Sequence, residues 1–177
     1  MGSPVVVLAS RVLEPVYGQS CSASPQQIVV YRGHNTTITS PGYPSNYGDN
    51  LVCTWRFQTG SYLSDVVKVT FNEFQVGVNS FRSCYGDHLD FHDGDSTTSN
   101  LLGSYCGTLH PEVIYSTGLS LYVKFISGYF YNDKGFSFNV AAVAKDEAAG
   151  ICRKTSGVSN DYVMPLSGPS GTILSPD

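Results

Sequence analysis

The chain has 177 residues, enough for one domain with additional segments. Only 14% of the residues are charged, the net charge is -4, and Lys and Arg together number 10. A chain of this kind has no basic stripe to neutralise phosphates, which argues against nucleic acid as a partner. Tyr (12), Phe (9) and Gly (18) are abundant, and this composition favours strands and turns, so we expect an all-β protein.

The first 20 residues do not form a complete signal peptide. Their apolar run is confined to Val5–Ala9, and no basic residue precedes it. We interpret residues 1–20 as a clipped leader, a cloning scar or a mis-called start. No stretch of the sequence reaches the roughly 18 apolar residues that a membrane span needs.

The cysteines and one sequon indicate secretion. The five cysteines contain no Cys-x-x-Cys pair, which weakens a zinc or redox interpretation and favours a secreted disulfide framework; they are Cys21, Cys53, Cys84, Cys106 and Cys152. Composition leaves open the three possible pairings of the first four. The only N-glycosylation sequon is Asn35-Thr36-Thr37, and we expect a glycan on Asn35.

Hydrophobic residues alternate with polar ones in several short segments, which predicts half-buried strands. The apolar positions, in chain order, are Cys53, Trp55 and Phe57; Val67, Val69 and Phe71; Leu89 and Phe91; Leu119, Leu121, Val123 and Phe125; Phe136, Phe138 and Val140. Turn-rich segments at 40–50, 93–100 and 127–135 separate these runs. Many short strands without a long helical segment predict a sandwich of two antiparallel sheets.

His88, Asp90 and His92 alternate with Leu89 and Phe91, so they share the polar face of one predicted strand. A metal site is one interpretation, although two histidines at this spacing start ~13 Å apart at the backbone. The alternative is an ordinary solvated sheet face. A third hypothesis is that these histidines become charged between about pH 7 and pH 5 and weaken a ligand.

Tyr129, Phe130 and Tyr131 lie in one turn-rich segment beside Asn132 and Asp133. Aromatic rings next to amide and carboxylate groups suit stacking on a sugar or anchoring of a protein partner. The alternative is that one or two of the rings cap the core. The candidate ligand-binding residues are therefore Tyr129, Phe130, Tyr131 and Asp133.

Ser, His and Asp residues are all present, but the motifs of an enzyme are not. The sequence contains no Gly-x-Ser-x-Gly elbow, no His-Glu-x-x-His pair and no phosphate-binding loop. We therefore expect no catalytic residues in this chain and classify it as a non-enzyme.

The segment Ser170–Asp177, "SGTILSPD", repeats the pattern of Asn35–Gly42, "NTTITSPG". Cys152 precedes the later copy much as Cys21 precedes the earlier one, so Cys152 is expected to be the first cysteine of a second unit, unpaired in this fragment. The predicted organisation is one complete domain at 21–143, a linker at 144–151 and the start of a second domain at 152–177.

Five motifs in chain order resemble the CUB domain family. They are "ITSPGYPSNYGDNLVCTWRF" (38–57), "VTFNEFQV" (69–76), "CYGDHLDFHDG" (84–94), "LLGSYCG" (101–107) and "GFSFNV" (135–140). The resemblance implies a jelly-roll-like sandwich with disulfides Cys21–Cys53 and Cys84–Cys106. It also implies a secreted or extracellular binding module, one of several CUB domains in its chain, that takes a protein ligand through the end loops of the sandwich. The alternatives are a glycan-binding module of the seminal-lectin type and a regulatory module of a secreted protease.

The same resemblance bears on calcium. Many CUB domains hold a calcium ion with a Glu after the "F-x-x-F-D-L" strand, an Asp three residues after the third cysteine, and an Asp in an "F-x-S-D" loop. Here Asp87 keeps the second position, whereas Gly77 and Gly128 occupy the other two. Calcium requires six to eight oxygen ligands with several carboxylates among them, so we expect no calcium and no other cofactor.

Overall fold

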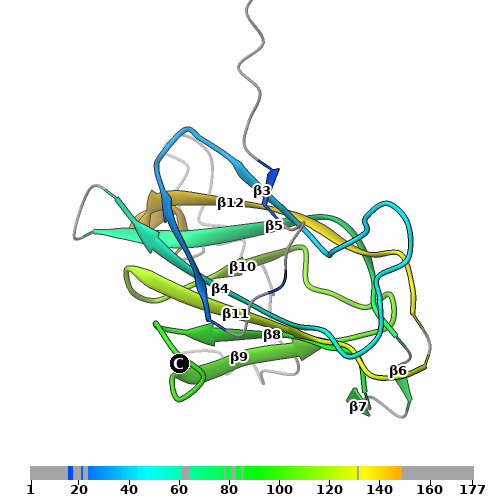
Figure 1. Cartoon of the computed structure of the whole chain (residues 1–177). Coiled ribbons are helices and arrows are strands. Elements are labelled where there is room, and N and C mark those ends of the chain that lie inside the picture. The colour runs from blue at the N-terminus through cyan, green and yellow to red at the C-terminus, as the bar shows by residue number, and fades with distance from the viewer. Residues whose placement is uncertain are drawn as a thin grey trace, which may run out of the picture.

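The computed structural model describes residues 16–17, 21, 24–60, 64–77, 79–80, 83–84, 86–130 and 132–148. The predicted second unit, with Cys152, lies outside these residues, as does Tyr131. Two five-stranded sheets face each other, which confirms the predicted all-β sandwich (Figure 1).

In spatial order, sheet A contains β1 (Val16–Tyr17), β3 (Thr36–Thr39), β12 (Gly135–Ala144), β5 (Asp65–Gln75) and β10 (Val113–Tyr115). Sheet B contains β2 (Gln26–Val30), β4 (Val52–Thr59), β11 (Ser120–Ile126), β8 (His88–Asp93) and β9 (Asn100–Tyr105). A separate short hairpin pairs β6 (Asn79–Ser80) with β7 (Ser83–Cys84). The pairings are antiparallel except for β1 with β3 and β2 with β4, which are parallel.

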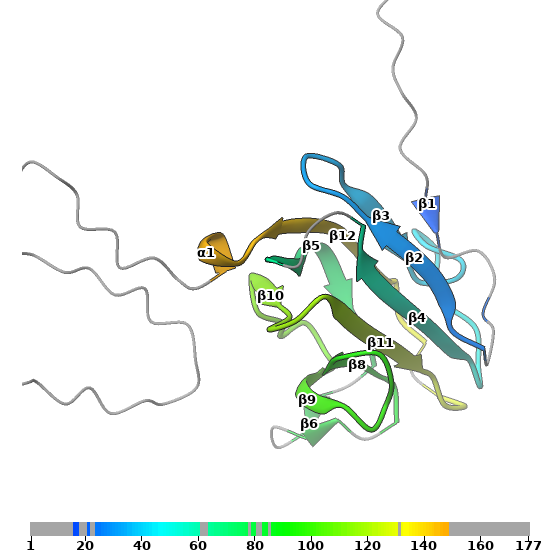
Figure 2. The ribbon, with the colours of Figure 1, turned by 90° about the vertical axis from the view of Figure 1, so that its left-hand side faces the viewer.

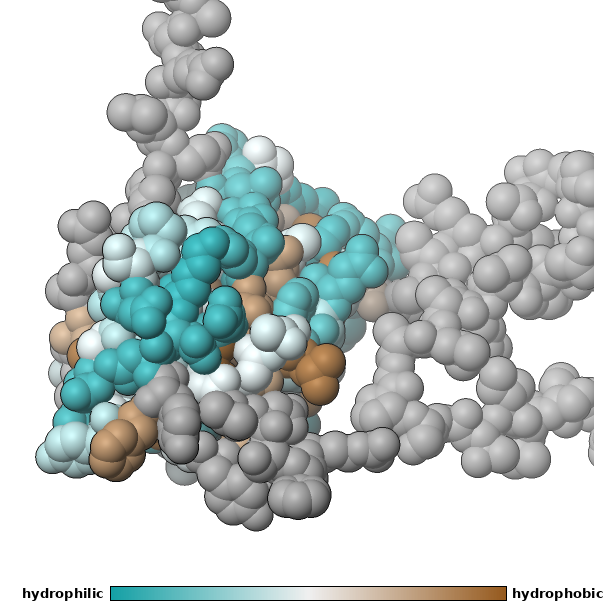
Figure 3. Space-filling model, turned by 90° about the vertical axis from the view of Figure 1, so that its right-hand side faces the viewer, coloured by the Kyte–Doolittle hydropathy of each residue, from teal (hydrophilic) through white to brown (hydrophobic). Residues whose placement is uncertain are grey.

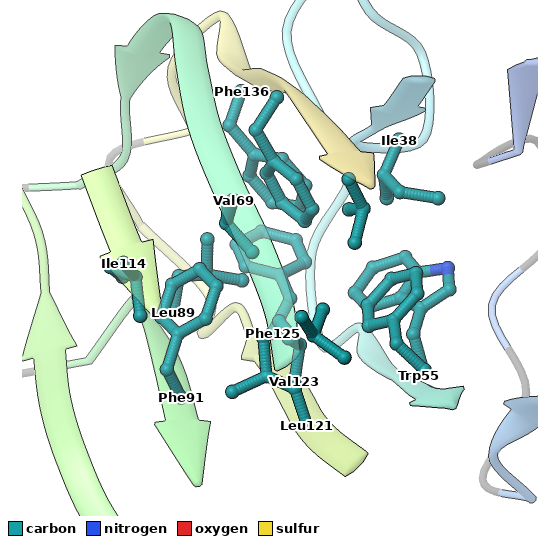
Figure 4. Packing of buried hydrophobic residues seen from close by; sticks show 14 of the residues in the cluster. Ile38, Trp55, Val69, Leu89, Phe91, Ile114, Leu121, Val123, Phe125 and Phe136 are labelled. Atoms are coloured by element: carbon teal, nitrogen blue, oxygen red, sulfur yellow. The ribbon is translucent and has the colours of Figure 1, made fainter. Parts of the chain in front are cut away.

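The core lies between the two sheets and follows from the period-two alternation (Figure 4). Most of the predicted apolar positions are buried there, including Trp55 from sheet B and Phe136 from sheet A. Their rings meet edge to face, with centroids 6.0 Å apart. Phe71 and Leu119 are the two predicted core positions that remain partly exposed. Aromatic contacts of this kind add to the hydrophobic stabilisation that burial provides.

Both disulfides that the resemblance implies are present. Cys21 is bonded to Cys53 of β4, and Cys84 of β7 is bonded to Cys106, which follows β9. The first bond ties the segment ahead of β2 to sheet B, and the second ties the hairpin to the main sandwich.

The ends of the sandwich differ in character. We call one of them the loop end; it consists of segments 40–51, 76–87 and 127–134, insofar as these are described. The opposite end, which we call the far end, carries the turns at 31–35, 93–99 and 116–119 and the short helix α1 (Lys145–Ala148), seen to project in Figure 2. None of the described helices is long and apolar enough to cross a membrane.

Strand β1 is an addition to what the sequence patterns indicate. Val16 and Tyr17 pair in parallel with Thr37 and Ile38 of β3, upstream of the domain start expected at Cys21. Two residues of the segment interpreted as a leader or scar thus contribute the edge strand of sheet A.

Candidate binding site

The loop between β11 and β12 presents two aromatic side chains to solvent. Tyr129 is 71% exposed and Phe130 is 77% exposed, so neither ring caps the core. Figure 3 looks onto the loop end, where the visible surface is mainly hydrophilic and the hydrophobic residues form small separate patches. Two large exposed rings on such a surface are available to contact a partner.

The base of this loop is held by the neighbouring 40–51 segment. Asn50 donates its backbone N–H to the Gly128 carbonyl at 2.9 Å, and Tyr47 donates its backbone N–H to the Asp133 carbonyl at 3.1 Å. The side chain of Asn46 also contributes, because its Nδ2 donates to the backbone carbonyl of Asn132 at 2.7 Å. The exposed rings therefore project from a loop whose flanks are fixed on both sides.

A buried polar centre lies beneath the loop. Tyr47 Oη donates to Asp87 Oδ2 at 2.6 Å, and the Gly128 N–H donates to Asp87 Oδ1 at 2.6 Å. Tyr47 Oη also accepts the Gly77 N–H at 2.9 Å. Burial, followed by the hydrogen bond to Asp87, raises the pKa of Tyr47, so its hydroxyl stays protonated and remains a donor.

A second polar cluster flanks the loop end on sheet A. Glu73 accepts hydrogen bonds from Lys134 Nζ and Tyr43 Oη. These two bonds, the one from Lys134 first, lower the pKa of Glu73, and the hydrogen bond to Glu73 raises the pKa of Lys134. Asp133, one of the predicted ligand-binding residues, accepts from Gln75 Nε2 at 3.1 Å and is partly buried.

The Glu73 cluster predicts a pH-dependent contribution to stability. Because the folded protein lowers the pKa of Glu73 below 4.5, the stabilisation is fully present above pH 4.5 and is lost as pH falls through the folded value. We expect Glu73→Gln to lower the melting temperature slightly at pH 7, and this difference from the wild type to shrink below pH 4.5. Thermal melts from pH 7 to about pH 3 measure it. Lys134→Met removes the other partner of the ion pair and should show the same pH dependence. A difference in melting temperature between wild type and Glu73→Gln that stays constant from pH 7 to about pH 3 contradicts the assignment.

His88, Asp90 and His92 share the outer face of sheet B, as predicted, but the face is not uniformly solvated. His92 is only 8% exposed; it lies against Tyr122, with ring centroids 6.1 Å apart, and its Nδ1 is 3.1 Å from the Ser99 carbonyl oxygen. His88 Nε2 lies 3.5 Å from Asp90 Oδ2, and the hydrogen bond between them raises the pKa of His88. Among the described residues no group of three His, Cys, Asp or Glu side chains is placed to hold a metal ion.

Asn35 lies at the far end, in the turn between β2 and β3, and its side chain is exposed. The position is accessible to a glycan, and its occupancy stays a prediction. Asn35 is separated from the loop end by the four residues of β3.

The sequence patterns pointed to the exposed rings, but they did not reveal Tyr47. That residue lies in a turn-rich segment whose composition predicts only a loop, and its partner Asp87 is 40 residues away. Asp87 itself is identified only through its offset from Cys84.

The sandwich and its two disulfides are those that the resemblance to CUB domains implies, and the comparison with known proteins agrees. The family model for the CUB domain matches residues 21–140, and the chain belongs to this family. Human Neuropilin-2 is 34% identical over 140 residues, and mouse Tolloid-like protein 2 is 34% identical over 114 residues. These alignments cover 78% and 64% of the chain, respectively. The solved extracellular region of zebrafish Gpr126/Adgrg6 matches with a TM-score of 0.54 and 25% identity, over 68% of this chain and 15% of that one.

The chain spans only 13% of the length of Neuropilin-2 and 10% of the length of Tolloid-like protein 2. What these comparisons describe is therefore a single module. CUB domains are generally non-catalytic interaction modules of extracellular proteins, and this chain contains one.

Proposed function

We propose that this chain is a secreted, non-catalytic module that binds an extracellular protein through its loop end. The observation that carries the proposal is the exposure of Tyr129 and Phe130 on a loop fixed at both flanks. Large aromatic side chains dominate the binding energy of many protein interfaces, and presenting them on an ordered loop reduces the entropy lost on binding. Asp133, in the same loop, belongs to the proposed contact surface, whereas Tyr131, also predicted from the sequence, lies outside the described residues.

The far end is less suited to this role. It carries the sequon at Asn35 and the helix α1, from which the chain continues toward the predicted second CUB unit. Its acidic groups are engaged locally: Asp93 accepts the backbone N–H of Thr117 at 2.8 Å, and Asp95 forms an ion pair with Arg56 at 2.8 Å. These features favour the loop end over the far end as the ligand-binding surface.

The disulfides and the family support an extracellular location, and the internal repeat supports an array of CUB units in the parent protein. Further CUB domains in the same chain are therefore proposed as neighbours. If the parent protein also contains a protease domain, this module would have a regulatory role in that protease. The complete parent sequence shows whether such a domain is present.

Screening the secreted domain in multivalent form tests the function. The domain is presented to a panel of purified secreted and cell-surface ectodomains, and in parallel to a glycan array. We expect at least one ectodomain to bind, and the double variant Tyr129→Ala/Phe130→Ala to weaken that binding at least about tenfold, the loss of two aromatic anchors. Surface plasmon resonance on each binder gives the measurement.

Leu101→Ala is the matched control, because Leu101 is also an exposed large hydrophobic residue but lies on β9, away from the β11–β12 loop. This variant should bind as the wild type does. Binding that survives the double variant contradicts the assigned surface. Binding to glycans alone, abolished by the same double variant, replaces the protein ligand with a carbohydrate.

A further inference from the structure

We propose that hydrogen bonds among Tyr47, Asp87, Gly77 and Gly128 close the loop end in the place where many CUB domains hold calcium, so that the order of the loop does not depend on the ion. Of the three carboxylates that the family places there, this chain keeps only Asp87. The residues present do not fit calcium, and three features of the described contacts show why.

The first feature is that both oxygens of Asp87 already accept strong donors. Oδ2 takes the Tyr47 hydroxyl at 2.6 Å and Oδ1 takes the Gly128 N–H at 2.6 Å. Asp87 is 3% exposed and Tyr47 is 1% exposed, so water competes little for these bonds. Buried hydrogen bonds to a charged acceptor are stronger than neutral ones, and the pair is held in one geometry.

The second feature is the backbone at Gly77, which replaces the family's glutamate. Its φ of +53° is a conformation that side-chain-bearing residues seldom adopt, and a Cβ built there would lie 2.8 Å from the Asp87 Cβ. The backbone at Gly77 packs directly against the Asp87 side chain, so a glutamate side chain at position 77 would not fit without a shift of Asp87. At Gly128, a Cβ would lie 3.4 Å from Asp87 Oδ1, which would bring any new carboxylate close to that oxygen.

The third feature is that two other carboxylates at or beside the loop end, those of Glu73 and Asp133, are engaged elsewhere. Glu73 accepts from Lys134 and Tyr43, and Asp133 accepts from Gln75. Calcium binds with six to eight oxygens and needs several carboxylates to compete with water. One carboxylate that is already paired does not meet that requirement, whereas the hydrogen-bonded centre joins all three segments of the loop end without an ion.

The test compares hydrogen exchange and thermal melting of the secreted protein in millimolar calcium, in magnesium and in chelator. We expect the same exchange rates at 127–134 and melting midpoints within about 1 °C in all three, because an ion that does not bind the folded state adds no stability. Terbium, which occupies calcium sites and luminesces on excitation of a nearby tyrosine, should give no saturable signal. A calcium-specific rise of several degrees, or saturable terbium luminescence displaced by calcium, overturns the proposal.

The variant Tyr47→Phe tests the positive half of the proposal. It removes the donor to Asp87 and the acceptor of the Gly77 N–H, so we expect faster exchange at 127–134 and unchanged exchange at the far-end turn 93–99. Asp93→Asn is the matched control, because Asp93 accepts comparable bonds from Thr117 at the far end. Exchange at 127–134 that is unaffected by Tyr47→Phe shows that this centre does not order the loop. If a variant does not fold, the measurements on the wild-type protein in calcium, magnesium and chelator still show whether the domain binds calcium.

Discussion

Phe136→Ala is expected to lower the free energy of unfolding by about 3–5 kcal/mol, the range for large aromatic truncations in a core. Phe136 has no exposed surface, and its ring meets Trp55, Phe125 and Phe138 at centroid distances of 6.0, 5.2 and 5.4 Å. Figure 4 shows Phe136 between the sheets with Trp55 and Phe125. It comes from sheet A, while Trp55 and Phe125 come from sheet B, so removing it opens a cavity between the layers. In a domain of this size the melting temperature should fall by more than about 10 °C.

The matched control is Phe130→Ala, the same chemical change six residues earlier. Phe130 is 77% exposed, so its truncation should alter the free energy of unfolding by less than about 0.5 kcal/mol. Denaturant unfolding of both variants measures the contrast. Similar losses for the two would show that Phe130 packs on the domain, and they would remove the support for its role as a binding residue.

Arg32→Ala should produce the second large loss, about 3 kcal/mol, because it leaves a buried charge without its partner. The Asp65 side chain has no exposed surface, and its Oδ1 accepts from Arg32 Nε at 2.9 Å and also from Nη2. The Oδ2 atom is buried and makes no hydrogen bond to the described part of the chain. Urea unfolding curves of wild type and variant give the difference in free energy.

The more exposed ion pair between Arg56 and Asp95 provides the control. Their side chains are 33% and 56% exposed, so Asp95→Ala should cost no more than about 1 kcal/mol. The double variant Arg32→Ala/Asp65→Ala should lose less than the sum of the two single losses, because neither charge then remains alone. Strict additivity would contradict the pairing.

Most of the sandwich could be predicted because side-chain alternation in a strand is a local property. Trp55 and Phe57 alternate with Arg56, and this pattern alone places them on the buried face. Strand β1 was not predicted, because it is too short to show side-chain alternation. Its two residues join sheet A through backbone pairing, which leaves no pattern in the side chains.

The loop end was only partly predictable because its contacts join residues that are distant in sequence. A turn-rich composition indicates that Tyr47 lies in a loop, but only the folded chain brings it to Asp87. The burial of His92 has the same origin: its cover comes from Tyr122 on the neighbouring strand, which its own strand pattern cannot reveal. The sequence allowed Tyr129 and Phe130 either to be exposed or to cap the core, and only the folded structure shows that both are exposed.

The pairing of β12 would determine how the domain responds to mechanical tension in the proposed array of CUB units. Cys21 is anchored at the loop end through Cys53, whereas the chain leaves β12 at the far end, after Ala144. Pulling on the two ends would first detach the two-residue strand β1, after which the disulfide would pass the load to β4. Strand β12 lies between β3 and β5 and would be loaded lengthwise, so its hydrogen bonds to both neighbours would resist sliding together rather than open one at a time.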